Sequence, residues 1–146
     1  MTVERTERAG GVFPQIPPGG LLFGLGIDVI EAARIKALLE RLPRAADRLF
    51  SPQEQEYCRR YADPYARFAA RFAAKEAVGK ALGIGIIGFV WRDIEVLSGG
   101  KPLVALHGGV ADIARRLGVT RVELSLSHTA GMAYAVAAAL KEDADV

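Results

Sequence analysis

The chain has 146 residues, of which 51% are hydrophobic and 25% are charged, and its formal net charge is +2. This composition is typical of one compact folded domain and excludes an intrinsically disordered chain. The small net charge provides no overall basic field for nucleic acid, so any charged partner must be recognised through a local patch.

The single cysteine, Cys58, cannot form an internal disulfide and suits a reducing compartment. No apolar run approaches the roughly 20 residues needed to span a bilayer, and residues 1–20 lack the apolar core of a secretory signal. We therefore expect a cytoplasmic protein that binds neither membranes nor nucleic acid. Because no histidine lies near Cys58 in sequence, we interpret it as an incidental thiol rather than a nucleophile.

Residues 1–20 combine charges, four glycines and three prolines, which predicts a flexible or loosely docked extension. The domain itself, residues 21–146, begins near Leu21. The apolar run from Leu21 to Ile27 ends in Asp28, and its length and glycines predict a buried strand.

Three helices are predicted next. Helical spacing of apolar residues favours a helix over 31–41, which Pro43 stops. Ser51, Pro52 and Glu54 form the pattern of a helix N-terminus with a capping box. An alanine-rich segment, about 65–82, predicts a third helix.

The sequence of the second half of the chain predicts mainly strands. Residues 93–97 and 102–106 flank a glycine-rich turn and predict a hairpin, and 109–117 predicts a short helix ended by Gly118. The alternating segment 121–127 predicts a half-buried strand, followed by a turn at 128–131. Residues 132–140 are apolar throughout, which favours a central strand, although their alanines also suit a helix. We expect an α+β fold, a single domain in which helices pack on a mostly antiparallel sheet.

Asp28 is the first candidate functional residue. A carboxylate at the end of a buried strand is held rigidly, as a functional group needs to be. Asp28 also suits the N-cap of a helix that begins near Ile30, and local sequence alone favours the cap.

Glu76 and Lys80 are four residues apart and share one face of the third predicted helix. A solvated surface pair of this kind contributes only roughly 0.3–0.5 kcal/mol. The neighbouring residues are alanine and glycine, which allow close approach, and Phe72 lies on the same face as Glu76. This pattern indicates a half-buried face on which a carboxylate and an amine can hold a metal ion and a phosphate.

His128 follows the alternating strand and, taken alone, suits a structural turn residue. His107 lies in a glycine-containing turn, and we interpret it as structural. Other motif classes are missing from the sequence: it has no dinucleotide-binding glycine pattern, no Walker sequence, no zinc-ligand spacing and no serine elbow.

Five segments together resemble the holo-acyl-carrier-protein synthase family of 4′-phosphopantetheinyl transferases, over about residues 21–140. In order along the chain they are Gly24–Glu31, Arg71–Gly83, Asp93–Val96, Gly100–Pro102 and Leu126–Thr129. The sequence departs from the family pattern at Gly83-Ile84-Gly85, where isoleucine replaces the usual threonine and removes a hydroxyl.

The resemblance implies that the protein transfers the 4′-phosphopantetheine group of coenzyme A to a serine of an apo acyl carrier protein. Adenosine 3′,5′-bisphosphate is the leaving group, and Mg²⁺ is the cofactor. It implies Asp28 and Glu76 as metal ligands and Glu76, Lys80 and His128 as catalytic residues. The implied coenzyme A-binding residues are Arg71, Lys80, Gly83, Ile84, Gly85 and His128.

The carrier partners of such enzymes are acidic, and the family is generally a homotrimer with its sites between subunits, acting in fatty acid biosynthesis and lipid metabolism. The arginines of the first helix and the segment after it, Arg34, Arg41, Arg44 and Arg48, are the expected carrier-binding residues. A solubilising face is the alternative interpretation of these charges. Ile84 to Val90 and Met132 to Leu140 are more apolar than a small monomer needs, which favours an interface between subunits.

Two other classes of function remain open at this stage. A noncatalytic trimeric domain that binds a ligand or a protein would keep the fold without needing Asp28, Glu76 and Lys80. Another Mg²⁺-dependent transferase or hydrolase of nucleotides or pyrophosphates would share the carboxylate pair but need no basic surface for a carrier protein.

Overall fold

The structure is a computed structural model that describes residues 20–85 and 90–142. Most of the predicted extension, residues 1–19, therefore lies outside the described residues, and Gly20 is the first residue of a strand. Residues 86–89 of the apolar segment Ile84–Val90 also lie outside them.

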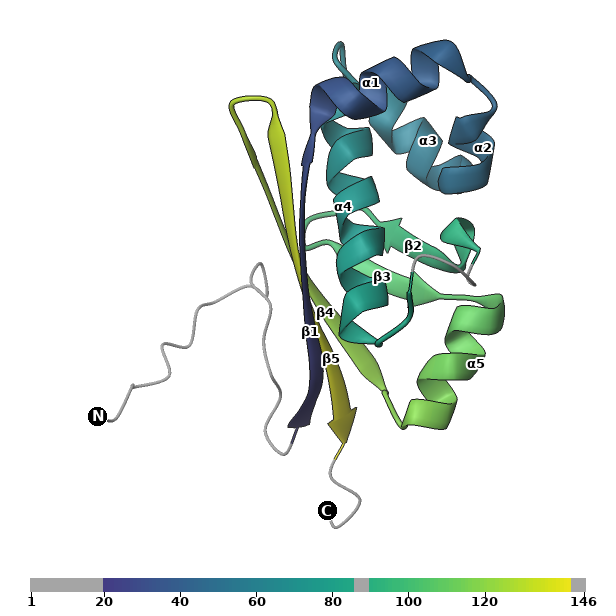
Figure 1. The fold of residues 1–146 in the computed structure, drawn as a ribbon, viewed down its shortest axis with the longest axis vertical. Coiled ribbons are helices and arrows are strands. Elements are labelled where there is room, and N and C mark those ends of the chain that lie inside the picture. Colours follow the sequence, from purple (N-terminus) through teal and green to yellow (C-terminus); the bar gives the residue numbers. More distant parts are fainter. Residues whose placement is uncertain (1–19, 86–89, 143–146) are drawn as a thin grey trace, which may run out of the picture.

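The chain alternates between helical and extended regions, and the α+β prediction is confirmed (Figure 1). The elements in order are β1 (Gly20–Glu31), α1 (Ala32–Arg41), α2 (Ala45–Leu49), α3 (Pro52–Arg59), α4 (Tyr65–Ala81), the 3₁₀ helix η1 (Trp91–Asp93), β2 (Ile94–Leu97), β3 (Leu103–Leu106), α5 (Gly108–Leu117), β4 (Arg121–Thr129) and β5 (Met132–Glu142). The short helices α2 and η1 were not predicted from the sequence.

Three long strands form one antiparallel sheet in the order β1-β5-β4, and β2 pairs with β3 in a separate antiparallel hairpin. The prediction of a central strand at 132–140 is confirmed by β5. Its alanines at alternate positions, such as Ala135 and Ala137, are fully buried. Their small side chains leave room for the helix that packs on them.

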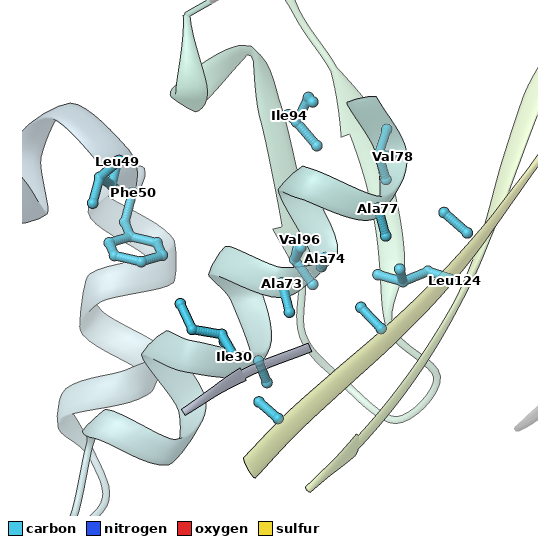
Figure 2. Close-up of a cluster of buried hydrophobic side chains, with 14 of the residues drawn as sticks. Ile30, Leu49, Phe50, Ala73, Ala74, Ala77, Val78, Ile94, Val96 and Leu124 are labelled. Carbon is cyan, nitrogen blue, oxygen red and sulfur yellow. The ribbon is translucent and has the colours of Figure 1, made fainter. Parts of the chain in front are cut away.

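That helix is α4, which lies along the sheet with the smaller hairpin beside it (Figure 1). Seven of its residues are alanines, and those facing the sheet and the core are buried. Figure 2 shows Ala73, Ala74, Ala77 and Val78 of α4 between Leu124 of β4 and Ile94 of β2. Within the described residues, 20–85 and 90–142, no helix is both long enough and apolar enough to cross a membrane.

The predicted capping box is confirmed at the start of α3. The Ser51 hydroxyl accepts a hydrogen bond from the Glu54 N–H, and the Glu54 carboxylate accepts one from the Ser51 N–H. These two bonds satisfy N–H groups that a helix start otherwise leaves unpaired.

Two local predictions are wrong. Asp28 is not a helix cap, because β1 continues to Glu31 and α1 begins only at Ala32. His128 is not in a turn, because β4 continues to Thr129 and the turn consists of Ala130 and Gly131 alone. Both of these turn residues have positive φ, 49° and 76°, as in the type I′ turns that commonly join two antiparallel strands.

Candidate functional site

The two faces of β1 differ in what covers them, and this difference determines where Asp28 points. Even-numbered residues from Gly24 to Ile30 face α4, whereas the odd-numbered residues Leu25, Ile27 and Val29 are exposed by 44–62%. Alternate side chains of a strand point to opposite faces, so Asp28 shares the helix-facing side with the glycines. Its side chain is 19% exposed.

Close contact between β1 and α4 depends on glycine. A Cβ atom on Gly24 would lie 2.1 Å from the carbonyl oxygen of Ala81, and one on Gly26 would lie 1.8 Å from that of Ala77. The strand and helix backbones therefore touch. The predicted burial of this strand is correct for one face only. Two glycines at alternate positions of a strand are a sequence signal for such an approach, and this signal was not used in the sequence analysis.

This close packing brings Lys80 to Asp28. The Lys80 Nζ donates a hydrogen bond to the carbonyl oxygen of Ile27 at 2.8 Å and lies 3.4 Å from Oδ1 of Asp28. The Lys80 side chain is still half exposed, so its charge remains available to a bound anion. The structure thus joins a residue of β1 to one that lies 52 positions away on α4.

Glu76 is the second carboxylate of this group. It is half-buried and lines a cavity of about 540 Å³ together with Asp28 and Phe72. Burial raises the pKa of Glu76, the nearby negative charge of Asp28 raises it further, and Lys80 opposes both effects. The expectation that Glu76 and Phe72 share a half-buried face is therefore confirmed.

The pair formed by Asp28 and Glu76 suits a hard divalent cation. Mg²⁺ is commonly held by one or two carboxylates together with substrate phosphates and water. Two carboxylates that disfavour each other's charge would both be stabilised by a cation between them. Within the described part of the chain, no group of three or more metal-binding side chains occurs, so the remaining ligands would have to come from substrate and water.

Two of the predicted carrier-binding residues, Arg34 and Arg41, line the same cavity from α1. Both are exposed. Arg44 and Arg48, at the start and in the last turn of α2, are exposed but do not line this cavity.

Arg71 and His128 lie in a different cavity, of about 440 Å³, between α4, β4 and the Ser98–Pro102 loop. Arg71 is 5% exposed, and its Nη2 donates a hydrogen bond to the Ser98 hydroxyl at 2.6 Å. Its Nε is buried and has no hydrogen-bond partner among the described residues. The residues that line this cavity include no aspartate or glutamate, so it favours an anion.

Arg67 also lines this cavity, and the sequence reasoning above missed it. Its guanidinium lies 3.6 Å from the ring centroid of Tyr61, and that of Arg71 lies 4.2 Å from the ring centroid of Tyr57. Like charges four residues apart on a helix destabilise it unless something compensates. The spacing of Arg67 and Arg71 was therefore a usable signal of an anion site.

The two cavities share no lining residue. Within one chain, the structure brings Asp28, Glu76, Lys80, Arg34 and Arg41 together, but it holds Arg71 and His128 apart from them.

Gly83, Ile84 and Gly85 line neither cavity. Gly83 has φ of 73° directly after α4, a conformation that favours glycine at the end of a helix. The side chain of Ile84 packs against the hydrophobic core.

The residues interpreted as structural have ordinary surroundings. Cys58 is fully buried, and burial raises its pKa to about 11, which keeps it a protonated thiol at neutral pH. The Nε2 of His107 pairs with Oε1 of Glu95 at 3.1 Å, away from both cavities.

Comparison with known proteins places these features in a family. The model of the 4′-phosphopantetheinyl transferase superfamily matches residues 24–139. The holo-[acyl-carrier-protein] synthase of Moorella thermoacetica is 49% identical over 119 residues, which make up 80% of this chain and 91% of that protein.

Solved structures agree with this assignment. The holo-ACP-synthase from Plasmodium yoelii has a TM-score of 0.77 and 27% identity, over 86% of this chain and 99% of that one. The Helicobacter pylori holo-[acyl-carrier-protein] synthase in complex with coenzyme A has a TM-score of 0.69 and 32% identity, over 79% of this chain and 98% of that one.

Proposed function

The chain belongs to the 4′-phosphopantetheinyl transferase superfamily, and we propose that it is a holo-[acyl-carrier-protein] synthase that uses Mg²⁺ held by Asp28 and Glu76. It transfers the 4′-phosphopantetheine group of coenzyme A to a serine of an apo acyl carrier protein. The observation that carries this proposal is the meeting of Asp28, Glu76 and Lys80 across β1 and α4, in a chain that matches such synthases over most of its length.

The reaction forms one bond to phosphorus and breaks another. The hydroxyl oxygen of the carrier serine bonds to the β-phosphorus of coenzyme A, and the bond from that phosphorus to the oxygen of the α-phosphate breaks. Adenosine 3′,5′-bisphosphate leaves with the bonding electrons, and a base takes the serine proton. Catalysis of such a transfer depends mainly on positioning and on neutralising charge.

Asp28 and Glu76 would hold the Mg²⁺, which when bound neutralises the charge of the pyrophosphate. The side chain of Lys80 is half exposed, and its Nζ lies beside Asp28, where it can contact the oxygen of the leaving phosphate. Glu76 is the proposed base, directly or through a water, because it lies on the wall of the cavity that Arg34 and Arg41 also line, where the carrier serine would arrive.

The cavity of Arg71 and His128 is the proposed contact for the phosphates of coenzyme A. Its cationic lining and the unpartnered Nε of Arg71 support an anionic ligand. Gly83, Ile84 and Gly85 would offer backbone contacts only, because Ile84 provides no hydroxyl and its side chain faces the core.

Arg34 and Arg41 are proposed to receive the acidic carrier protein. They line the cavity of Glu76, so a carrier seated on α1 would present its serine to the proposed base. Arg44 and Arg48 would extend this basic surface along α2 and steer the carrier during encounter.

A homotrimer would combine the two cavities. The open face of β1 carries exposed apolar side chains that a second copy could cover, namely Leu21, Phe23, Leu25, Ile27 and Val29. A site shared between copies would place the Arg71 and His128 cavity of one copy next to the Asp28 and Glu76 pair of its neighbour. This proposal places the enzyme in the cytoplasm, in fatty acid biosynthesis, where its single Cys58 would remain reduced.

One incubation tests the function against its alternatives. The protein is mixed with coenzyme A, Mg²⁺ and an apo acyl carrier protein, and the carrier is weighed by mass spectrometry. We expect the carrier to gain the mass of one phosphopantetheine group. An unchanged carrier with coenzyme A consumed would indicate a different transferase or hydrolase, and no reaction at all would indicate a noncatalytic binding domain.

A further inference from the structure

Next to Glu76 in the sequence, Lys75 forms a buried ion pair with Glu54, and neither residue lines either cavity. The Nζ of Lys75, the residue before Glu76, is 2.8 Å from Oε1 of Glu54, and both side chains are 0% exposed. Charged side chains are almost never buried to this extent without specific partners. The pair therefore needs an explanation beyond ordinary packing.

Each proton of the Lys75 ammonium group has an acceptor. Besides Glu54, the Nζ donates to the carbonyl oxygen of Trp91 at 3.2 Å and to that of Ile94. These carbonyls belong to η1 and to the first residue of β2. Lys75 thus attaches the middle of α4 to the start of the hairpin.

The Glu54 carboxylate is equally well satisfied. Its Oε1 also accepts a hydrogen bond from the Ser51 N–H at 2.9 Å, and its Oε2 accepts one from the Val96 N–H at 3.1 Å. The Glu54 side chain therefore caps the N-terminus of α3, forms an ion pair with Lys75 of α4 and accepts a hydrogen bond from β2.

Stability alone is a weak reason for such an arrangement. Removing two charges from water costs free energy, and apolar replacements of buried ion pairs are often neutral or stabilising. A fully satisfied polar network does, however, allow only one relative arrangement of its elements. Here those elements are α3, α4, η1 and β2.

The network also reaches the proposed metal site through packing. Trp91 stacks on Phe72, with ring centroids 5.0 Å apart and planes 18° apart, and Phe72 lines the same cavity as Glu76. On its other side α4 rests on Gly24 and Gly26 of β1. The helix that carries Glu76 is therefore fixed from two directions, by backbone contact with β1 and by the ion pair.

We propose that Lys75 and Glu54 are positioning residues for the metal site: their buried pair sets the depth and rotation of α4 that bring Glu76 to Asp28. This inference rests on the proposed function, because it concerns the same two carboxylates. It assigns to the pair a role in metal affinity that is separable from its role in stability.

The test uses Mn²⁺ as the probe, since carboxylate sites for Mg²⁺ also accept Mn²⁺. Its affinity for the full-length protein, freed of metal and saturated with coenzyme A as the source of the remaining ligands, is measured by electron paramagnetic resonance, and Tm is measured on the same samples. Lys75→Met alone leaves the Glu54 charge buried and should lower Tm strongly. The double variant Lys75→Met/Glu54→Gln leaves no unpaired charge and keeps an acceptor for Ser51, so its Tm should recover partly.

We expect the double variant to bind Mn²⁺ about 10- to 100-fold more weakly than the wild type despite its recovered Tm, as changes behind metal ligands typically do. Val78→Ala is the matched control, because it removes buried volume from the same helix but none of the network's hydrogen bonds. It should lower Tm and keep the wild-type affinity.

The inference would be overturned if the double variant bound Mn²⁺ as tightly as the wild type. It would also be overturned if Mn²⁺ affinity fell in proportion to Tm in all three variants, Val78→Ala included, because affinity would then depend on stability alone. A wild-type protein that binds no Mn²⁺, or binds it equally well after Asp28→Asn, would instead overturn the proposed metal site, and this inference with it.

Discussion

A Cβ atom on Gly26 would lie 1.8 Å from the carbonyl oxygen of Ala77, so the backbones of β1 and α4 are in direct contact at this point. No rotation of a side chain can relieve that overlap, because the obstacle is main chain. The contact holds α4 close enough for Lys80 to reach the Ile27 carbonyl and Asp28.

Gly26→Ala should therefore destabilise the protein strongly. Overpacking typically costs about 1–3 kcal/mol, and contact with rigid backbone places this substitution at about 3 kcal/mol. A fall in Tm of about 10 °C, measured by thermal denaturation, is expected for a chain of this length. Gly109→Ala is the control, because its nearest neighbour is an ordinary 3.9 Å away, and equal Tm values for the two variants would contradict the close contact.

Glu76→Gln should stabilise the metal-free protein at neutral pH while impairing its activity. The folded-state pKa of Glu76 is raised above the ordinary 4.5 by burial and by Asp28. A carboxyl of this kind favours folding when protonated, and the benefit is lost as pH rises through its folded pKa. The neutral Gln avoids that loss.

Tm measurements in the presence of a chelator check this prediction. The variant should exceed the wild type by a few degrees at neutral pH, and the difference should disappear below pH 4.5. Glu56→Gln, at an exposed position paired with Arg60, should show no such gain. A Glu76→Gln variant that is less stable at neutral pH would mean that Lys80 outweighs burial and Asp28.

Arg34→Glu combined with Arg48→Glu should raise the KM for the acyl carrier protein and leave the KM for coenzyme A unchanged. Reversed charges repel an acidic partner, and the effect should weaken as salt is added. Initial rates at varied concentrations of each substrate provide the measurement. Arg116→Glu, an exposed charge on α5, is the control, and an equal rise in both KM values would exclude a carrier-docking role.

Leu25→Glu should dissociate the proposed trimer. Leu25 is 62% exposed on the open face of β1, so in a monomer the substitution would cost little. Sedimentation velocity should show a trimer for the wild type and monomers for the variant. A wild-type protein that sediments as a monomer would leave the two cavities of one chain unconnected and contradict a shared site.

The regular elements were predictable because their signals are local. The helical spacing in α1, the capping box of Ser51 and Glu54 and the apolar run of β5 each depend on residues that are neighbours in sequence. The position of Asp28 was not predictable in the same way. The local sequence is compatible with a strand that ends before Asp28 and with one that continues to Glu31. The strand continues because β1 pairs with β5 as far as Glu31.

The candidate residues, and the grouping of Asp28 with Glu76 and Lys80, were expected from the sequence, but the separation of Arg71 and His128 from that group was not. Arg71 and Glu76 are five apart on one helix, and only the packing around α4 separates them into two cavities. The role of Gly26 and the contacts of Lys75 likewise depend on elements distant in sequence. Arg67 was overlooked because its partner ring, Tyr61, lies before α4 rather than on it.

The most direct test of the account is the Mg²⁺ dependence of carrier modification in the wild type, Asp28→Asn and Glu76→Gln. The rate at which the apo carrier gains phosphopantetheine is measured over a series of Mg²⁺ concentrations. We expect both variants to lose at least about 100-fold in rate, with Asp28→Asn needing more Mg²⁺ than the wild type. Wild-type rates and an unchanged Mg²⁺ requirement in both variants would contradict the assignment of Asp28 and Glu76 as the metal site.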